Sequence, residues 1–405
     1  MSECSTRRQF LQATSAGLLA AGYTSTSWAA SANDTLNIGC IGTGGRSRQL
    51  MGNLRELPGA KLVAVCDVWD QHREQGRELC ESDCKVFTDY RKLLEETDID
   101  AVVIGAPDHW HVPMTIDACA AGKDVYVEKP LTHDVSEGAA VIKAQNDSQR
   151  IVQVGMQQRS MPHIQQANEL IRAGHIGDVH KVHLSWNRNA QRGSKKDYGI
   201  DPKSVDWQRF LGNAPEQPFD GYRFRNWRWF WDFGGGIFTD LMVHWIDVAH
   251  WILETGAPQQ AASIGDHFTT KGIWETPDTV QTILKYPENG VQAYFEGTFF
   301  NARNRAMIEF MGTKGTIYID RGRYEVHPDP HQDLEASELV LGTEPRGADF
   351  FANPNGTRLH LANWLECCRT RKTPNAPVEV GVTAAAAAHL ANQSLRTGKM
   401  AFGRI

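Results

Sequence analysis

Short apolar runs alternate with helical patterns from residue 35 to about residue 155. Each run is mostly apolar and partly β-branched, which is typical of a strand that is buried on both faces. These runs predict strands at 36–42, 61–67, 85–87, 101–107, 125–130 and 151–155. Between them, helical spacing of apolar residues is found at 47–57, 90–96, 113–122 and 135–147. Strands that alternate with helices in this way predict βαβ units and a parallel sheet.

A different pattern begins after Arg159. Helices are predicted near 161–173, 238–253, 358–370 and 382–396. Four alternating runs separated by glycine-containing turns predict antiparallel strands at 279–287, 291–299, 306–312 and 315–320. An irregular stretch at 188–235 is longer than structureless loops usually are, which indicates a functional role.

Composition narrows the class of protein. The chain has 405 residues, 41% hydrophobic and 22% charged, which is typical of a globular protein with two or three domains. Its formal net charge of −6 argues against nucleic acid or an anionic membrane as the main partner. The eight cysteines include no C-x-x-C pair and several lie within apolar runs, so buried thiols are favoured over a disulfide scaffold.

The N-terminus has the features of an export signal. The letters TRRQFL at residues 6–11 match the twin-arginine pattern, and the apolar run at 13–22 is too short and too polar to span a membrane. Small residues at 30–32 offer a cleavage site. We therefore predict a signal peptide at 1–32, export by the twin-arginine translocase, and a periplasmic or extracellular location. The alternative is a cytoplasmic protein with a basic N-terminus.

A glycine-rich turn lies between the first predicted strand and the first predicted helix, where the phosphate loop of a dinucleotide site belongs. In its sequence GTGGRS, Gly42, Gly44 and Gly45 permit a tight turn and let backbone N–H groups approach a pyrophosphate. Asp67 ends the next strand, near the usual spacing for a carboxylate that binds ribose hydroxyls. Apolar residues follow it rather than an arginine, which favours NAD over NADP. A glycine turn without a ligand is the alternative interpretation.

The sequence Glu128-Lys129-Pro130 ends another strand of the predicted parallel sheet, at the edge where ligands bind. Pro130 restrains the backbone of Lys129 and so directs its side chain. A lysine at that edge can stabilise a developing alkoxide. Taken alone, however, a Lys-Pro pair is more often a surface lysine.

A third motif, GGGIFTDLMVHWIDVAHW, begins at Gly234. If it is helical from about Thr239, Asp240, His244 and Asp247 fall on one face. A histidine can take a proton from a hydroxyl, and a carboxylate one turn away can orient it or bind a neighbouring hydroxyl. No metal site is predicted, because H-E-x-x-H is absent. The alternative is the polar face of a solvated helix.

Together, IGCIGTGG, VAVCD, APDHWH, VEKP and TDLMVHWID resemble the Gfo/Idh/MocA oxidoreductases, particularly exported bacterial members with twin-arginine leaders. The resemblance implies a Rossmann-type NAD-binding domain at 33–157 and a C-terminal α+β domain at 158–405. The second domain would carry a large, open, mostly antiparallel sheet for substrate binding and oligomerisation. Its last helices would pack back toward the first domain. Ser47 and the aromatic segment NWRWFWDF depart from the family pattern.

The resemblance also implies roles for individual residues. The catalytic residues would be Lys129, Asp240 and His244. The cofactor contacts would be Gly42, Gly44, Gly45, Arg46, Asp67, Asp108, His111, Glu128 and Gln157.

These observations predict an exported oxidoreductase that transfers hydride between a sugar or polyol carbon and a tightly bound NAD. Scarcity of NAD outside the cytoplasm requires tight binding and regeneration in place. The alternative is a redox-neutral, NAD-dependent glycosidase or lyase, and a non-catalytic sugar-binding protein is a third possibility. Trp227, Trp229 and Trp231 are candidates to stack on a sugar ring or to form subunit contacts. A homo-oligomer, dimer or tetramer, is expected from the resemblance.

Overall fold

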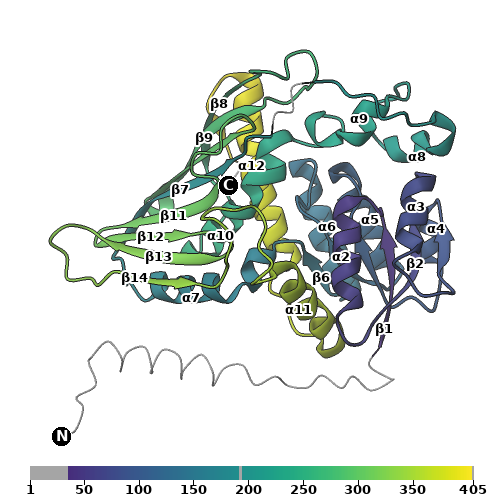
Figure 1. The fold of residues 1–405 in the computed structure, drawn as a ribbon, viewed down its shortest axis with the longest axis horizontal. Coiled ribbons are helices and arrows are strands. Elements are labelled where there is room, and N and C mark those ends of the chain that lie inside the picture. Colours follow the sequence, from purple (N-terminus) through teal and green to yellow (C-terminus); the bar gives the residue numbers. More distant parts are fainter. Residues whose placement is uncertain (1–34, 191–193, 404–405) are drawn as a thin grey trace, which may run out of the picture.

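The computed structural model describes residues 35–190 and 194–403, so the predicted leader at 1–32 lies outside the described residues. Within them the chain forms two sheets joined by a layer of helices (Figure 1). No helix in this part of the chain is long and apolar enough to cross a membrane. The same residues hold no cluster of three metal-ligating side chains.

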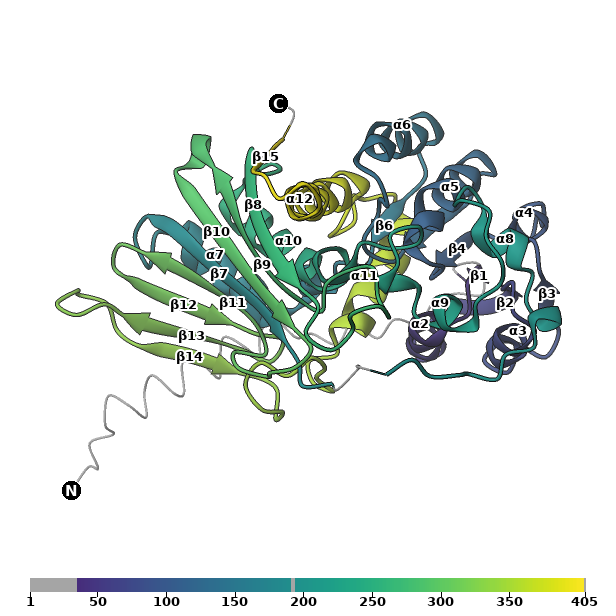
Figure 2. The same cartoon turned by 90° about the horizontal axis from the view of Figure 1, so that it is seen from above.

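The N-terminal domain is built on a six-stranded parallel sheet in the order β3-β2-β1-β4-β5-β6. Its strands are β1 (Leu36–Ile41), β2 (Ala60–Cys66), β3 (Lys85–Phe87), β4 (Ala101–Ile104), β5 (Asp124–Val127) and β6 (Val152–Val154). Its helices are α2 (Gly45–Arg55), α3 (Asp70–Arg77), α4 (Tyr90–Leu94), α5 (Asp108–Ala120) and α6 (Gly138–Ser148). The central strands β4 and β5 are buried along their whole length because helices cover both faces of the sheet (Figure 2). The prediction of a parallel, doubly covered sheet is confirmed.

The second domain contains a nine-stranded sheet in the order β14-β13-β12-β11-β7-β10-β9-β8-β15. The strands are β7 (Val179–Asn187), β8 (Gln260–Asp266), β9 (Thr279–Tyr286), β10 (Val291–Thr298), β11 (Ala306–Gly312), β12 (Gly315–Ile319), β13 (Arg323–Pro328), β14 (Ser337–Val340) and β15 (Ala401–Phe402). Among the described strands of this second sheet, only the β7–β10 pair is parallel, which confirms a mostly antiparallel sheet. The sequence did not predict β7, β8, β13, β14 or β15. Of these, β8, β13 and β14 lie toward an edge and contain few apolar residues, and β15 is only two residues long.

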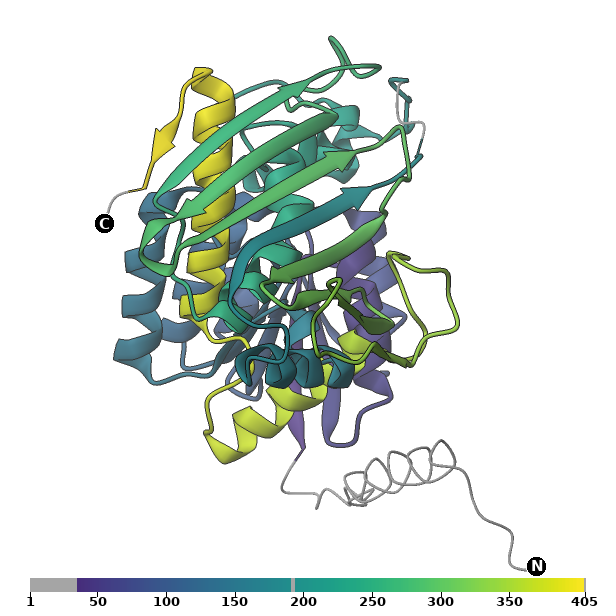
Figure 3. The ribbon, with the colours of Figure 1, turned by 90° about the vertical axis from the view of Figure 1, so that its left-hand side faces the viewer.

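Helices cover one face of this sheet and leave the other open within the chain (Figure 3). The covering helices are α7 (Pro162–Arg172), α10 (Val243–Leu253) and α12 (Val378–Thr397). Burial along β9 alternates from residue to residue, as expected for a sheet with one covered face. On the open face Ile264 and Ile283 are 70% and 54% exposed.

The C-terminal helices also pack against the first domain. Helix α11 (Gly356–Thr370) lies beside α2, where Arg358 Nη1 is 2.9 Å from Glu56 Oε2. His360, fully buried on α11, shares one hydrogen bond of 2.9 Å with the carbonyl oxygen of Val154 and another of 2.7 Å with the Ser160 hydroxyl. These contacts fix the second domain against the carboxyl end of β6.

Residues 194–235, called here the cover segment, return from the second domain and lie over the carboxyl ends of the parallel strands (Figure 1). The segment carries α8 (Trp207–Leu211) and α9 (Gly221–Arg225). The backbone N–H of Asp206 donates to the carbonyl oxygen of Val68 at 2.8 Å, and Trp110 Nε1 donates to the carbonyl oxygen of Phe210 at 2.9 Å. The cover segment, which falls within the stretch predicted to be irregular, thus packs on the N-terminal domain.

Candidate active site

A cavity of about 330 Å³ lies between the glycine loop and the cover segment. Gly42 has φ +75°, and a Cβ there would lie 2.6 Å from the backbone nitrogen of Ala106, so only glycine fits. A Cβ on Gly45 would meet no protein atom within 4 Å, and one on Gly44 would meet only the His72 ring, at 3.7 Å or more. These two glycines therefore leave open space beside the N-terminus of α2, as a loop that holds a pyrophosphate requires.

Asp67 lies at the wall of this first cavity, with its carboxylate fixed by the loop. The backbone N–H groups of Thr43 and Trp69 donate to it at 2.7 and 2.9 Å. His72 Nδ1 is 3.5 Å from the same carboxylate. Asp67, the predicted ribose contact, therefore also holds the phosphate loop in position.

The cover segment forms the opposite wall of the first cavity through Arg209, Phe210, Phe224 and Arg225. Phe210 and Phe224 pack together with ring centroids 4.9 Å apart. A ligand in this cavity is therefore enclosed between the parallel sheet and a wall contributed by the second domain.

A second cavity, of about 360 Å³, continues from the first. Gly45, Arg46, Trp227 and Arg228 line both cavities, so the two are neighbouring parts of one long cleft. Lys129, Asp240 and His244 all line the second cavity. The three predicted catalytic side chains therefore meet in one place, although Lys129 follows β5, Asp240 precedes α10 and His244 lies in its first turn.

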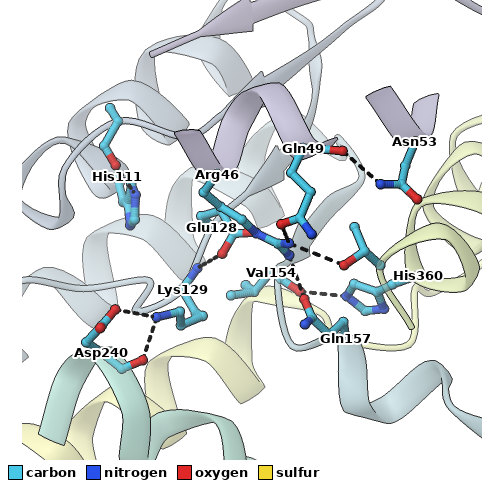
Figure 4. Close-up of polar contacts among 12 residues, drawn as sticks. Arg46, Gln49, Asn53, His111, Glu128, Lys129, Val154, Gln157, Asp240 and His360 are labelled. Carbon is cyan, nitrogen blue, oxygen red and sulfur yellow. Dashed lines mark hydrogen bonds and ion pairs between the residues drawn. The ribbon is translucent and has the colours of Figure 1, made fainter. Parts of the chain in front are cut away.

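Lys129 and Asp240 form an ion pair in this cavity (Figure 4). Lys129 Nζ donates to the Asp240 carbonyl oxygen at 2.6 Å and to its Oδ1 at 3.0 Å. Arg228 Nε lies 3.2 Å from the same Oδ1. Burial alone would raise the pKa of Asp240, but the Lys129 and Arg228 charges outweigh it and hold that pKa below its usual value. The carboxylate is therefore ionised and keeps the ammonium in a fixed position.

Arg46, Glu128 and Gln157 form a second cluster beside Lys129 (Figure 4). Arg46 Nε lies 2.8 Å from Glu128 Oε1, and Arg46 Nη2 donates to Gln157 Oε1 at 2.6 Å. Burial would raise the pKa of Glu128, but the Arg46 and Lys129 charges lower it overall. This cluster joins the glycine loop to the residues that follow β5 and β6, next to the catalytic candidates.

His244 is 7% exposed and has no hydrogen-bond partner at Nδ1 among the residues described. Burial, followed by the Lys129 and Arg321 charges, holds its pKa well below the usual value, so the imidazole is neutral at neutral pH. A neutral imidazole that lines the cavity is able to accept a proton from a substrate hydroxyl.

The helix that carries these residues differs from the regular one that the sequence predicted. Residues Phe238–Met242 form a π-helical turn, and α10 begins at Val243. Asp247, predicted on the same face as His244, instead pairs with buried Arg159, with Nη2 and Oδ1 2.8 Å apart. The interpretation of Asp247 as part of the site face is wrong, and so is the picture of a solvated polar face, because α10 is buried nearly all round.

Two predicted cofactor residues lie deeper in the fold. Asp108 is buried at the start of α5 and lines neither cavity; burial raises its pKa well above the usual value. His111 lines the second cavity, with its ring nitrogens 2.7 and 2.8 Å from the carbonyl oxygens of Pro130 and Ala106. It thereby braces the segment that carries Lys129.

Comparison with known proteins places this arrangement in a family. The family model described as the oxidoreductase family with an NAD-binding Rossmann fold matches residues 36–156. The Gfo/Idh/MocA C-terminal domain model matches residues 164–318. The chain belongs to the Gfo/Idh/MocA oxidoreductase family. Its N-terminal domain is accordingly an NAD-binding Rossmann domain.

Several characterised Gfo/Idh/MocA proteins are similar to it. The scyllo-inositol 2-dehydrogenase (NAD(+)) of Bacillus subtilis is 29% identical over 329 residues, covering 78% of this chain and 81% of that one. The 2,7-anhydro-N-acetylneuraminate hydratase of Mediterraneibacter gnavus is 23% identical over 336 residues, covering 79% and 80%. A solved levoglucosan dehydrogenase in complex with NADH has a TM-score of 0.71 at 19% identity, covering 92% of this chain and all of that one.

From the sequence of this Gfo/Idh/MocA protein, each of three tryptophans was a candidate to stack on a sugar ring or to form a subunit contact. The structure places the three side chains in different surroundings. Trp227 lines both cavities. Trp229 is 2% exposed and stacks on Trp274 with centroids 4.5 Å apart. Trp231 packs against Arg396, whose guanidinium carbon is 4.9 Å from the ring centroid. Of the three, only Trp227 is placed to contact a ligand in the cleft.

The sequence interpretation missed three further side chains that line the second cavity, Trp186, Arg188 and Arg321. Trp186 and Arg188 lie at the end of β7. Ligands often bind at strand ends, so this position could have indicated a site. Arg321 follows β12 and nothing in its sequence neighbourhood indicates a site. Trp186 Nε1 and Arg321 Nε are buried without hydrogen-bond partners within the described chain, as His244 Nδ1 is. Unsatisfied polar atoms around one cavity are what a polar substrate would satisfy.

Proposed function

We propose that this protein is an exported, NAD-dependent oxidoreductase that transfers hydride between a carbon of a sugar or polyol and a tightly held NAD. The observation that carries the proposal is the meeting of Lys129, Asp240 and His244 in a cavity that continues from the dinucleotide loop. NAD, when bound, supplies the hydride acceptor or donor. The open space at Gly44 and Gly45 and the fixed Asp67 fit that cofactor.

Each catalytic candidate has a role that follows from its charge state. Neutral His244 takes the proton of the hydroxyl on the carbon that loses hydride, and returns it in the reverse direction. The Lys129 ammonium donates to the same oxygen and stabilises negative charge as it develops. Asp240 holds that ammonium in place through the ion pair.

Enclosure of the first cavity supports tight retention of the cofactor. The cover segment supplies one wall, and its contacts with Val68 and Trp110 hold it against the sheet. This wall buries part of the surface of a bound dinucleotide, which slows dissociation. Retention matters for an exported protein because free NAD is scarce outside the cytoplasm.

A redox-neutral reaction is the second candidate. The name of the Mediterraneibacter gnavus relative, a hydratase, describes addition of water without net oxidation. In such a reaction, transient oxidation of a sugar carbon would acidify a neighbouring C–H, elimination would follow, and the hydride would return. The same three side chains would serve both routes.

The near-ultraviolet absorbance of the purified protein, without added cofactor, tests the proposal. We expect about one NAD or NADH per chain after dialysis, and a change in the reduced-nicotinamide band when the correct sugar is added. A persistent change indicates net oxidoreduction, whereas product formation with recovery of the band indicates the redox-neutral route. Protein that carries no cofactor and binds none when it is added would favour a sugar-binding protein and contradict the proposal.

The proposal of export rests on the paired arginines at residues 7 and 8. Replacement of both by lysine keeps the charge but removes the twin-arginine pattern. We expect the Arg7→Lys/Arg8→Lys double variant to accumulate in the cytoplasm, whereas the parent chain appears in the periplasmic or extracellular fraction. Fractionation followed by immunoblotting measures this, and equal export of the two chains would contradict the assignment.

The open face of the nine-stranded sheet supports a homo-oligomer. Exposed apolar side chains such as Ile264 and Ile283 lie there on the neighbouring strands β8 and β9, two residues apart in the register. Burial of such a face against a second copy would remove apolar surface from water.

A further inference from the structure

The second cavity carries more positive than negative charge. Its cationic side chains are Arg46, Lys129, Arg188, Arg228 and Arg321, and its carboxylates are Glu128 and Asp240. Asp349, which pairs with Arg188, adds a third carboxylate at the edge. The two histidines that line the cavity have lowered pKa values, first because of burial, and add no charge at neutral pH. Two positive charges therefore remain without a matching carboxylate.

Arg321 accounts for much of this excess. It is 3% exposed, and no carboxylate within the described part of the chain lies within ion-pairing distance of it. Its Nη1 donates to the backbone carbonyl oxygen of Asp349, and its Nε has no hydrogen-bond partner among the described residues. Burial, above all, lowers the pKa of Arg321 to about 9. A buried guanidinium without a counter-ion is costly unless a ligand supplies one.

The turn between β12 and β13 fixes the position of Arg321. Asp320 accepts hydrogen bonds from the backbone N–H groups of Gly322 at 2.7 Å and Arg323 at 3.0 Å, and from Gly347 at 2.7 Å. The guanidinium is thus presented by an ordered turn rather than by a free surface loop.

Arg321 and Arg188 both contact the ring of Trp186. The guanidinium carbons of Arg321 and Arg188 lie 4.8 and 5.5 Å from the Trp186 ring centroid. The indole Nε1 is buried and without a hydrogen-bond partner among the described residues. Two guanidinium groups and an indole N–H, all hydrogen-bond donors only, therefore gather around one part of the cavity.

This group of donors is separate from the dinucleotide loop. Arg46 and Arg228 line both cavities, so they are placed to reach the phosphates of the cofactor. Arg188 and Arg321 line only the second cavity. An anion bound by Arg188 and Arg321 would therefore belong to the substrate rather than to the cofactor.

We propose that the substrate is a sugar acid, whose carboxylate binds to Arg321 and Arg188 beside Trp186. The proposal rests on the proposed function, since it names the substrate class of the same site. Planar guanidinium groups match a carboxylate through paired N–H donors, which makes this anion the best fit to the site. A carboxylate here also partly offsets the cationic surroundings of His244, and so makes that imidazole a stronger base.

The proposed carboxylate site is tested on the NAD-loaded protein by comparing sugar acids with their neutral counterparts. Glucuronate, galacturonate and their methyl glycosides are each compared with the neutral glucose or galactose counterpart, and with glucose 6-sulfate. Binding is measured by titration calorimetry, and turnover by the nicotinamide band. We expect at least one acid to bind about tenfold or more tightly than its neutral counterpart, the usual scale for a charge-assisted pair.

The variant Arg321→Gln should remove that preference by raising KM for the acid about 10- to 100-fold, with little change for the neutral sugar. Arg188→Gln, at a more exposed position, should act in the same direction and serves if Arg321→Gln does not fold. Arg172→Gln is the matched control, because Arg172 lies on α7 and pairs with Glu254 away from both cavities. It should leave the preference unchanged.

Three results would overturn the proposal: neutral sugars that bind as well as the acids, a preference that survives both variants, or no binding of any acid in the panel. Equal binding of the sulfate ester would overturn the choice of carboxylate. Turnover of neutral sugars without binding of acids would contradict this inference while leaving the proposed function intact. Tight binding of acids without any change at the nicotinamide would support this inference and contradict the proposed function.

Discussion

Replacement of Lys129 by alanine is expected to lower kcat about a thousandfold, or about 4 kcal/mol in activation free energy, while bound NAD remains at about one per chain. The loss follows because the ammonium is held by Asp240 inside the second cavity, where it stabilises the oxygen that loses its proton. The cofactor stays because Lys129 does not line the first cavity. Steady-state rates at the nicotinamide band, together with nucleotide extracted from the purified variant, give the two readouts.

Two further substitutions sharpen this test. Lys129→Arg keeps the charge but changes its shape and hydrogen-bond geometry, and should recover only part of the rate. Lys143→Ala removes an exposed lysine on α6 that pairs with Asp147, and should have the rate of the parent protein. A Lys129→Ala protein with nearly full activity would show that another group polarises the oxygen.

Replacement of His244 by asparagine should lower kcat by about 10²- to 10⁴-fold, the usual contribution of a positioned general base. Asparagine retains a polar side chain of similar size but cannot accept the proton at neutral pH. His180→Gln, at an exposed position on β7, is the matched control and should leave kcat unchanged. Undiminished turnover in His244→Asn would assign proton transfer to a different residue.

The pH profile separates a catalytic role of His244 from a structural one. The base must be neutral, so protonation of His244 inactivates the enzyme as pH falls. Burial and the surrounding cations hold its pKa well below 6.5 in the free protein, so the acid limb of kcat/KM should begin well below pH 6.5. This limb should disappear from the residual activity of His244→Asn. A limb that persists in the variant would belong to another group.

The sequence alone determined the N-terminal domain and its ligand edge. Apolar runs that alternate with helices can form only a sheet covered on both faces, and glycines at the first turn leave space that other residues would fill. These features are local, so they were read from neighbouring residues. The catalytic candidates Lys129, Asp240 and His244 were found because each lies in a compact motif.

The tertiary structure decided which distant residues share the cleft and what charge each carries. Arg321 meets Trp186 across the second sheet, and the cover segment closes over Asp67, although nothing near either in the sequence indicates these contacts. Buried Arg159 pairs with Asp247, which therefore does not line the cavity. The neutrality of His244 and the excess charge beside it arise from burial, which depends on packing from many elements at once. Local pattern specifies which elements form, whereas the chemistry of the site depends on contacts that exist only after those elements have packed.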